Sequence, residues 1–276
     1  MQLKISGKTK ITGLFGYPVE HTLSPAMHNA AFNALGIDYC YIPFLVHPDY
    51  LENAVKAIRA LNIIGVNVTV PHKENVMPFL DEINEEASFI GAVNTIVNNN
   101  GMLKGYNTDG KGFIQLLIES GISIDNKDIL IIGAGGASRA ISYYACQKAK
   151  NLYIYNRTRE RAENLVKDLK KICKRVSVHE SISHIENFHI IINATSVGLK
   201  DEDPSPFNTS LLNSEQIICD IVYKQTRLLK EASQRGCMVI DGSGMLLWQG
   251  ILAFELWTGK TPPADIMRKA LKTFNQ

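Results

Sequence analysis

The sequence has few cysteines and shows no sign of a disulfide framework. Five cysteines occur among 276 residues, an odd number, and no two of them form a C-x-x-C pair. Histidine offers no better metal site, because His179, His184 and His189 follow one another at a spacing that places them on different faces of a helix. We therefore expect reduced thiols, no bound metal and a cytoplasmic protein.

The chain also lacks an excess of charge and a long hydrophobic run. Twenty-nine Lys and Arg against 27 Asp and Glu give a formal net charge of +2, far from the basic excess of a nucleic-acid binder. The longest uncharged stretches, such as Ser24–Ile37 and Gly242–Phe254, are too short to span a membrane. Met1–Lys10 has no apolar segment of the kind found in a signal peptide. We expect neither a nucleic acid nor a membrane as partner, and this profile favours small-molecule chemistry.

Composition and length indicate about two globular domains. Hydrophobic residues make up 45% of the chain and charged residues 20%, which is enough for packed cores. The first half alternates short strands and helices. Hydrophobic periodicity and turn residues there predict strands at Ile11–Phe15, Tyr39–Leu45 and Ile63–Val70, a hairpin of Ala92–Val97 with Met102–Tyr106, and helices from Ser24 to Gly36 and over Tyr50–Leu61.

In the second half, apolar strands alternate regularly with helices, a pattern typical of a parallel sheet covered on both faces. An α/β fold class follows for the whole chain. The last two helices, Met245–Trp257 and Pro263–Phe274, could cap the second sheet or return to the first domain, and the local pattern does not choose between them. The expected strands are Asp128–Ile132, Leu152–Tyr155, His189–Asn193, Gln216–Ile221 and Met238–Ile240, and the expected helices are Ala137–Ala149 and Glu160–Ile172.

A glycine loop between a strand and a helix predicts a dinucleotide site. Glycines there permit a tight turn and let backbone N–H groups approach a pyrophosphate at the helix N-terminus. Ser138 stands where the fingerprint would have a third Gly or Ala, and a plain tight turn is the alternative interpretation. The loop consists of Gly133, Ala134, Gly135, Gly136 and Ala137.

The end of the next strand favours NADP over NAD. An NAD binder places Asp or Glu there for the ribose 2′-hydroxyl, but this chain has Asn156, Arg157 and Thr158, with Arg161 close behind. Guanidinium groups bind a 2′-phosphate, which a carboxylate would repel. The alternative interpretation is that these arginines are simply solvated at the start of a helix, and we prefer this interpretation for Arg159.

Polar residues in the first half stand where structure alone does not require them. Lys73 follows a buried strand, Asn94 lies within an expected strand, and Asp109 follows another. Ligands collect beyond the carboxyl ends of strands, where a Lys and an Asp could pair for proton transfer. The alternative is a surface lysine with Asp109 as a helix cap. Ser24 is likewise explained as the N-cap before Pro25, which would leave the hydroxyl of Thr22 the freer one.

Taken together, eight segments resemble the shikimate dehydrogenase family in the same order along nearly the whole chain. They are GYPVEHTLSPAMHN (16–29), NVTVPHK (67–73), GAVNT (91–95), GYNTDG (105–110), GAGGASRA (133–140), NRT (156–158), NATSVG (193–198) and GMLLWQG (244–250). The resemblance implies reversible NADPH-dependent reduction of 3-dehydroshikimate to shikimate in aromatic amino-acid biosynthesis.

The resemblance also implies a role for individual residues. Lys73 would be the acid/base group, with Asp109 beside it, and Thr22 and Ser24 would hold the substrate carboxylate. The family usually has Ser at the position of Thr22, which concerns selectivity, and His72 receives no role. Ring hydroxyls would be bound by Thr69, Asn94, Asp109 and Gln249, with Tyr223 lining the pocket, and the cofactor by Gly133 to Ala137, Asn156 to Arg161, Ile221 and Gly242.

The resemblance divides the chain into a substrate domain of residues 1–110 and 243–276 and an NADP-binding Rossmann domain of residues 111–242. The last helices then return to the first domain, because Gln249 must reach the substrate. A homodimer is compatible with the sequence. Three other interpretations stay open: a quinate/shikimate dehydrogenase using NAD or both cofactors, a non-catalytic NADP-binding regulator, and a methyltransferase, which the arginine-rich segment disfavours.

Overall fold

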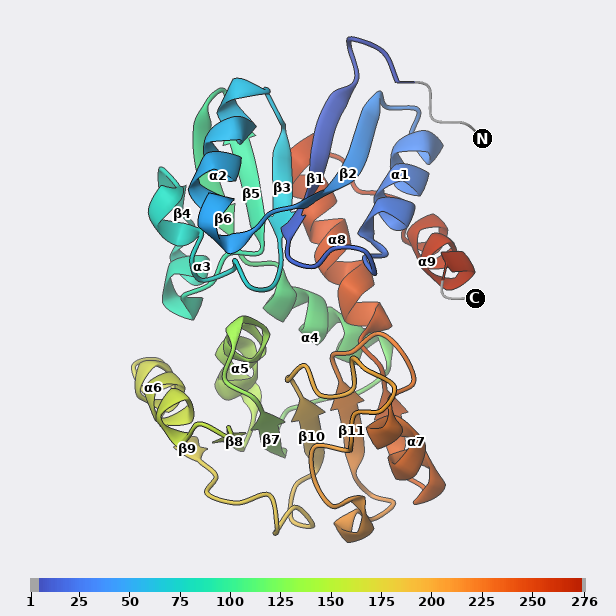
Figure 1. Cartoon of the computed structure of the whole chain (residues 1–276). Coiled ribbons are helices and arrows are strands. Elements are labelled where there is room, and N and C mark those ends of the chain that lie inside the picture. Colours follow the sequence, from blue (N-terminus) through green and yellow to red (C-terminus); the bar gives the residue numbers. More distant parts are fainter. Residues whose placement is uncertain (1–4, 275–276) are drawn as a thin grey trace. The chain divides into compact units, whose positions relative to one another are not determined.

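The computed structural model describes residues 5–274, and the chain divides into two compact units. The first unit comprises Met1–Thr108 and Leu247–Gln276, and the second comprises Asp109–Leu246. The first unit is therefore discontinuous in sequence, with the second inserted between its two segments. Figure 1 labels most helices and strands of both units.

The sheet of the first unit is mixed, with strand order β2-β1-β3-β5-β6-β4. Strand β1 pairs in parallel with β2 and β3, whereas β5 runs antiparallel to both β3 and β6, and β4 pairs in parallel with β6. The strands are β1 (Lys10–Gly16), β2 (Tyr39–Leu45), β3 (Gly65–Val68), β4 (Glu82–Ile83), β5 (Thr95–Asn99) and β6 (Met102–Tyr106).

Two strands of this sheet are shorter than the sequence predicts. Strand β3 ends at Val68 rather than at Val70, because the chain turns there and the N–H of His72 donates to the carbonyl of Thr69. Strand β5 begins at Thr95, and the expected start at Ala92 is wrong because the N–H of Val93 donates instead to the carbonyl of Lys73. Asn94 therefore lies just before a strand and not within it.

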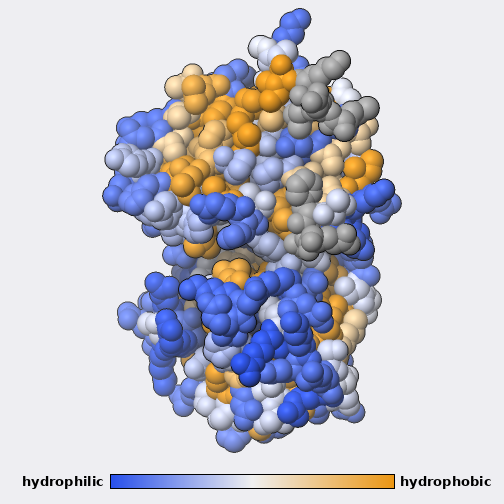
Figure 2. Space-filling view, turned by 45° about the vertical axis from the view of Figure 1, so that its right-hand side comes forward, coloured by the Kyte–Doolittle hydropathy of each residue, from blue (hydrophilic) through white to orange (hydrophobic). Residues whose placement is uncertain are grey.

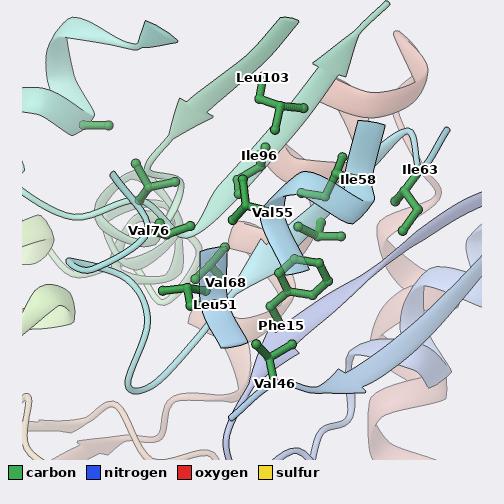
Figure 3. Packing of buried hydrophobic residues seen from close by; sticks show 13 residues of the cluster. Phe15, Val46, Leu51, Val55, Ile58, Ile63, Val68, Val76, Ile96 and Leu103 are labelled. Atoms are coloured by element: carbon green, nitrogen blue, oxygen red, sulfur yellow. The ribbon is translucent and has the colours of Figure 1, made fainter. Parts of the chain in front are cut away.

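Helices cover this sheet, and helix α2 packs onto a cluster of buried hydrophobic residues on one face. Figure 3 shows Leu51, Val55 and Ile58 of α2 packed over Phe15 and Val68 of the strands, all buried. Their spacing of three and four residues is what predicted this helix. The helices that belong to the unit are α1 (Ser24–Ala34), α2 (Leu51–Ala60), α3 (Glu85–Ile90), the part of α8 (Ser243–Thr258) from Leu247 onward, and α9 (Ala264–Phe274).

The C-terminal helices return to the first unit, as the family resemblance implies. Helix α9 packs against α1. The indole N–H of Trp257 on α8 donates to the carbonyl of Ile96 in β5 at 3.0 Å. Gly65 in β3 lies so close to the Trp257 ring that a Cβ there would overlap it. This expectation is therefore confirmed.

The second unit contains a sheet in which all strands are parallel, in the order β12-β11-β10-β7-β8-β9. Strands β7 and β10 are almost wholly buried, which explains why they read as continuous runs of Ile and Leu. The α/β fold class is confirmed. Its elements are β7 (Asp128–Ile132), β8 (Asn151–Tyr155), β9 (Val176–Val178), β10 (Ile190–Asn193), β11 (Ile217–Asp220), β12 (Met238–Ile240), α4 (Asp109–Glu119), α5 (Gly136–Lys148), α6 (Arg159–Leu169) and α7 (Arg227–Gln234).

The surfaces of the two units differ in hydropathy. Figure 2 shows hydrophobic side chains gathered on the visible surface of the first unit, whereas the visible surface of the second unit is mainly hydrophilic. Among the exposed large hydrophobic residues of the first unit are Ile42 and Leu45 on the edge strand β2. Within residues 5–274, no helix is both long enough and apolar enough to cross a membrane.

Candidate active site

The start of helix α1 presents the hydroxyl groups of Thr22 and Ser24. The N-cap of this helix is Leu23, in helical conformation, and Ser24 is its first residue. The interpretation of Ser24 as the cap is therefore wrong. The oxygen of the Thr22 hydroxyl accepts the N–H of Ser24 at 3.3 Å, a role in the turn that the sequence did not predict. The turn begins one residue earlier than expected, which leaves the Ser24 side chain for other partners.

The Ser24 side chain hydrogen-bonds to Tyr41, a residue that the sequence did not single out. Tyr41 lies in β2 and is buried, and its hydroxyl donates to Oδ1 of Asn67 at 2.8 Å. Burial raises the pKa of the Tyr41 phenol, so it stays protonated and donates. An asparagine within the buried strand Gly65–Val68 was a signal that could have pointed to Asn67.

Asn94 connects this network to the start of helix α4. Nδ2 of Asn67 donates to the Asn94 carbonyl at 3.2 Å, and Oδ1 of Asn94 accepts the N–H of Thr108 at 2.8 Å. Nδ2 of Asn94 lies 2.9 Å from the Thr108 hydroxyl. Asp109, the next residue, is buried and is the first residue of α4. Asn94 therefore fixes the backbone directly before Asp109.

Lys73 lies in the connection after β3, and its backbone is fixed on both sides. Its carbonyl accepts the N–H of Val93 at 2.8 Å. The preceding residue, His72, is buried and its Nε2 lies 2.7 Å from the carbonyl of Val46. This contact gives His72 the structural role that the sequence left unassigned. The Lys73 side chain is half-buried, and so is Thr69.

The two remaining predicted substrate residues come from different units. Gln249 lies on α8 in the first unit and is buried, with 8% of its surface exposed. Tyr223 follows β11 in the second unit and is half-buried, and burial raises the pKa of its phenol.

The glycine loop of the second unit has the geometry of an anion-binding turn. Gly133 has φ +118°, and a Cβ there would lie 2.8 Å from the carbonyl oxygen of Ala194. No atom lies within 4 Å of a Cβ placed at Gly135, so the space beside it is open. The hydroxyl of Ser138 donates to the Gly133 carbonyl at 2.6 Å, which explains how serine replaces the third glycine of the fingerprint.

The segment after β8 distinguishes its arginines. Asn156 is held by a bond from its Nδ2 to the carbonyl of Thr158 at 2.8 Å. The guanidinium of Arg159 pairs with Glu163 at 2.7 Å and with Glu180 at 3.2 Å. Arg157 and Arg161 are exposed, and no ion pair to either occurs in the described part of the chain. They are the arginines available to a phosphate.

The ends of β11 and β12 meet at the last two predicted cofactor residues. A Cβ at Gly242 would overlap the carbonyl oxygen of Ile221, and the N–H of Gly242 donates to the carbonyl of Val222 at 3.1 Å. Buried Asp220 supports this turn by accepting from the Thr226 hydroxyl at 2.8 Å. Burial raises the pKa of the Asp220 carboxyl.

The structure brings the predicted residues into separate groups. Ser24 and Asn94 are linked through Tyr41 and Asn67 in the first unit. The glycine loop and Asn156 are neighbours in the second unit, where the N–H of Gly133 donates to the carbonyl of Tyr155 at 2.7 Å. In residues 5–274, no group of three or more His, Cys, Asp and Glu side chains could hold a metal ion.

Comparison with known protein families identifies the family of the chain. Residues 14–96 match the shikimate dehydrogenase substrate-binding domain, residues 116–201 match shikimate/quinate 5-dehydrogenase, and residues 242–272 match the shikimate 5′-dehydrogenase C-terminal domain. A shikimate dehydrogenase (NADP(+)) from Desulforamulus reducens is 48% identical, over 97% of this chain and 96% of the relative. The chain belongs to the shikimate dehydrogenase family.

Solved structures of the shikimate dehydrogenase family share the fold over nearly the full length of the chain. One shikimate dehydrogenase crystallised with NADP+ is 40% identical, with a TM-score of 0.92 over 98% of this chain and 97% of that one. The Thermus thermophilus enzyme, in complex with NADP(H) and shikimate, is 36% identical with a TM-score of 0.89, over 96% of this chain and all of that one. The resemblance found in the sequence motifs is confirmed.

Proposed function

We propose that the chain catalyses the reversible reduction of 3-dehydroshikimate to shikimate by NADPH, a step of aromatic amino-acid (chorismate) biosynthesis. The buried hydrogen-bonded network from Ser24 to Asn94 carries the proposal, because it holds family-matched residues in fixed positions. Polar side chains are costly to bury, so such a network points to a polar ligand. Membership of the shikimate dehydrogenase family supports the same reaction.

In this proposal the first unit holds the cyclic hydroxy acid. The hydroxyls of Thr22 and Ser24 would donate to its carboxylate at the start of α1, where the helix dipole favours an anion. The ring hydroxyls would be bound by Thr69, Asn94, Asp109 and Gln249, with Tyr223 against the ring. Asn94 and Thr108 fix each other through three hydrogen-bonding contacts, which favours selective recognition of hydroxyl groups.

The second unit fits an NADP molecule. The open space at Gly135 would accommodate a pyrophosphate, and the N–H groups of the first turn of α5 have no acceptor within the helix. Asn156, Arg157, Thr158 and Arg161 would bind the adenosine ribose and its 2′-phosphate, and Ile221 and Gly242 would flank the nicotinamide end. When bound, NADP supplies the hydride chemistry of the reaction.

The protein's chemical task is then to move one proton. In shikimate oxidation, Lys73 would accept the proton of the reacting hydroxyl, and in reduction it would return that proton to the alkoxide. Asp109 would orient the same hydroxyl toward the lysine. The bonds that fix the backbone around Lys73 and before Asp109 hold both groups in place before substrate arrives.

A spectrophotometric assay tests the proposed function. Shikimate and NADP are mixed with the protein, and we expect absorbance of the reduced cofactor to rise. Initial rates are then compared for NADP against NAD and for shikimate against quinate. A higher kcat/KM with quinate or NAD would assign the chain to the quinate/shikimate dehydrogenases. NADP binding without turnover of either acid would indicate a non-catalytic regulator.

Replacing Arg157 with alanine should raise KM for NADP about tenfold or more and leave KM for shikimate unchanged. The reason is loss of a charge-assisted bond to the 2′-phosphate, which contributes about 1.5–3 kcal/mol. Arg159→Ala is the matched control, since its guanidinium already pairs with Glu163 and Glu180. Equal effects of the two substitutions would argue against a specific role for Arg157.

We further propose that the substrate and cofactor domains correspond to residues 1–110 with 243–276 and to residues 111–242. The division into compact units at Thr108/Asp109 and Leu246/Leu247 supports boundaries close to these. A cytoplasmic location is supported by five free thiols. A homodimer stays a prediction, which sedimentation or size-exclusion chromatography with light scattering would test.

A further inference from the structure

His28 is a buried titratable side chain that the proposed chemistry does not use. It lies one helical turn after Ser24 on α1 and has no exposed surface. Neither ring nitrogen has a hydrogen-bond partner in the described part of the chain. Burial lowers its pKa to about 3, so the ring is neutral at physiological pH. Burying a polar ring without hydrogen bonds is unfavourable, so hydrogen bonding does not explain why a histidine occupies this position.

The ring of His28 is packed between aromatic side chains of β2 and α8. It stacks on Tyr41 with a centroid distance of 4.4 Å and an interplanar angle of 8°. It is also nearly parallel to Phe254, at 6.2 Å and 3°, and lies 5.4 Å from the ring of Trp257. On one side, His28 therefore contacts Tyr41, which hydrogen-bonds Ser24. On the other side it contacts α8, the helix that carries Gln249.

Helix α8 packs against α1 at Gly250, the residue after Gln249. A Cβ at Gly250 would overlap the Cε of Met27 and would lie 3.5 Å from Nε2 of His28. The distance between Gly250 and α1 therefore determines the position of the backbone at the neighbouring Gln249. Imidazole is the smallest aromatic ring available, and Phe would add a carbon at the edge that faces Gly250.

We propose that His28 is a positioning residue for Gln249. Its flat, uncharged ring sets the spacing between α1 and α8, and thereby the place of the Gln249 amide against the substrate. The role depends on the shape of the ring and not on a proton. This inference rests on the proposed function, because it takes Gln249 as a substrate-binding residue.

A double-mutant cycle between His28 and Gln249 tests the inference. We expect His28→Phe to raise KM for shikimate about tenfold, with kcat less affected and KM for NADP unchanged, because a misplaced amide weakens substrate binding. In the Gln249→Ala background the same substitution should change KM less than about twofold, because the positioned group is gone. A merely structural role would lower thermal stability and give equal changes in both backgrounds, which would overturn the proposal.

Further measurements separate failure of the inference from failure of the proposed function. An inactive wild-type protein would contradict the function, and hydrogen exchange of α8 then reports on His28 without substrate. We expect His28→Phe to speed exchange around Gln249 and to leave α6 unchanged; identical exchange in α8 would refute the inference. If His28→Phe does not fold, the smaller His28→Gln replaces it in the same cycle and is judged by the same two outcomes.

Discussion

Replacing Lys73 with alanine lowers kcat for shikimate oxidation by a factor of about 100 to 10,000 while KM for NADP stays unchanged. This is the range that general acid–base catalysis contributes. The lysine has a fixed backbone, since its own carbonyl and the ring of His72 are both hydrogen-bonded. Loss of the amine is therefore expected to remove the proposed proton acceptor while these backbone bonds remain. Steady-state kinetics with both substrates varied measures the effect.

Two variants control for charge and for general surface effects. Lys73→Met keeps the length of the side chain without its amine and should be as impaired as alanine. Lys56→Ala removes an exposed lysine of the same unit, paired with Glu52 on α2, and should keep full turnover. Near-wild-type kcat in Lys73→Met would remove this lysine from the proton transfer.

Lowering the pH from 6.5 to 5 destabilises the first unit by about 2 kcal/mol through His28 alone. The His28 pKa is 6.5 in the unfolded chain and about 3 when buried, so the unfolded state binds the extra proton throughout this range. Stability is therefore fully present above pH 6.5 and decreases as the pH falls toward 3. The neighbours of the ring, Met27, Phe32, Tyr41, Phe254 and Trp257, carry no charge that could offset this.

Denaturant unfolding followed by tryptophan fluorescence measures this pH dependence. The chain has two tryptophans, Trp248 and Trp257, and both lie on α8 in the first unit. His28→Phe has no titratable ring at this position, so it lacks this loss of stability. The free energy of unfolding of the variant minus that of the wild type should therefore be about 2 kcal/mol more positive at pH 5 than at pH 7, whatever its value at pH 7. A stability difference that does not change with pH would contradict a buried neutral histidine.

The sequence motifs predicted the family and most strands of the second unit, because buried parallel strands are continuous apolar runs. They missed α4, whose first turn contains Gly110 and Gly112, since glycine disfavours helices. The structure supplies the reason: a Cβ at Gly110 would overlap the carbonyl oxygen of Ala140 on α5. Close packing of α4 against α5 therefore overrides the low helix propensity of glycine, and the sequence pattern does not indicate this packing.

Predictions of hydrogen-bonding roles were less successful than predictions of elements. Ser24 and Pro25 have the sequence of a helix cap, yet the Ser24 side chain bonds to Tyr41, which is distant in sequence. Tyr41 was unremarkable as an aromatic residue in a strand, and its polar role depends on Asn67 in a neighbouring part of the sheet. Such pairings depend on strand order, which motifs do not contain.

The bond between Trp257 and Ile96 joins residues 161 positions apart. During synthesis, the second unit is complete once Leu246 has left the ribosome, whereas the first unit still lacks α9 and most of α8. The part of the chain made first is thus the part finished last. Until then, the parts of β3, β5 and α1 that α8 and α9 will contact are exposed, and a chain truncated before Leu247 would leave them open permanently.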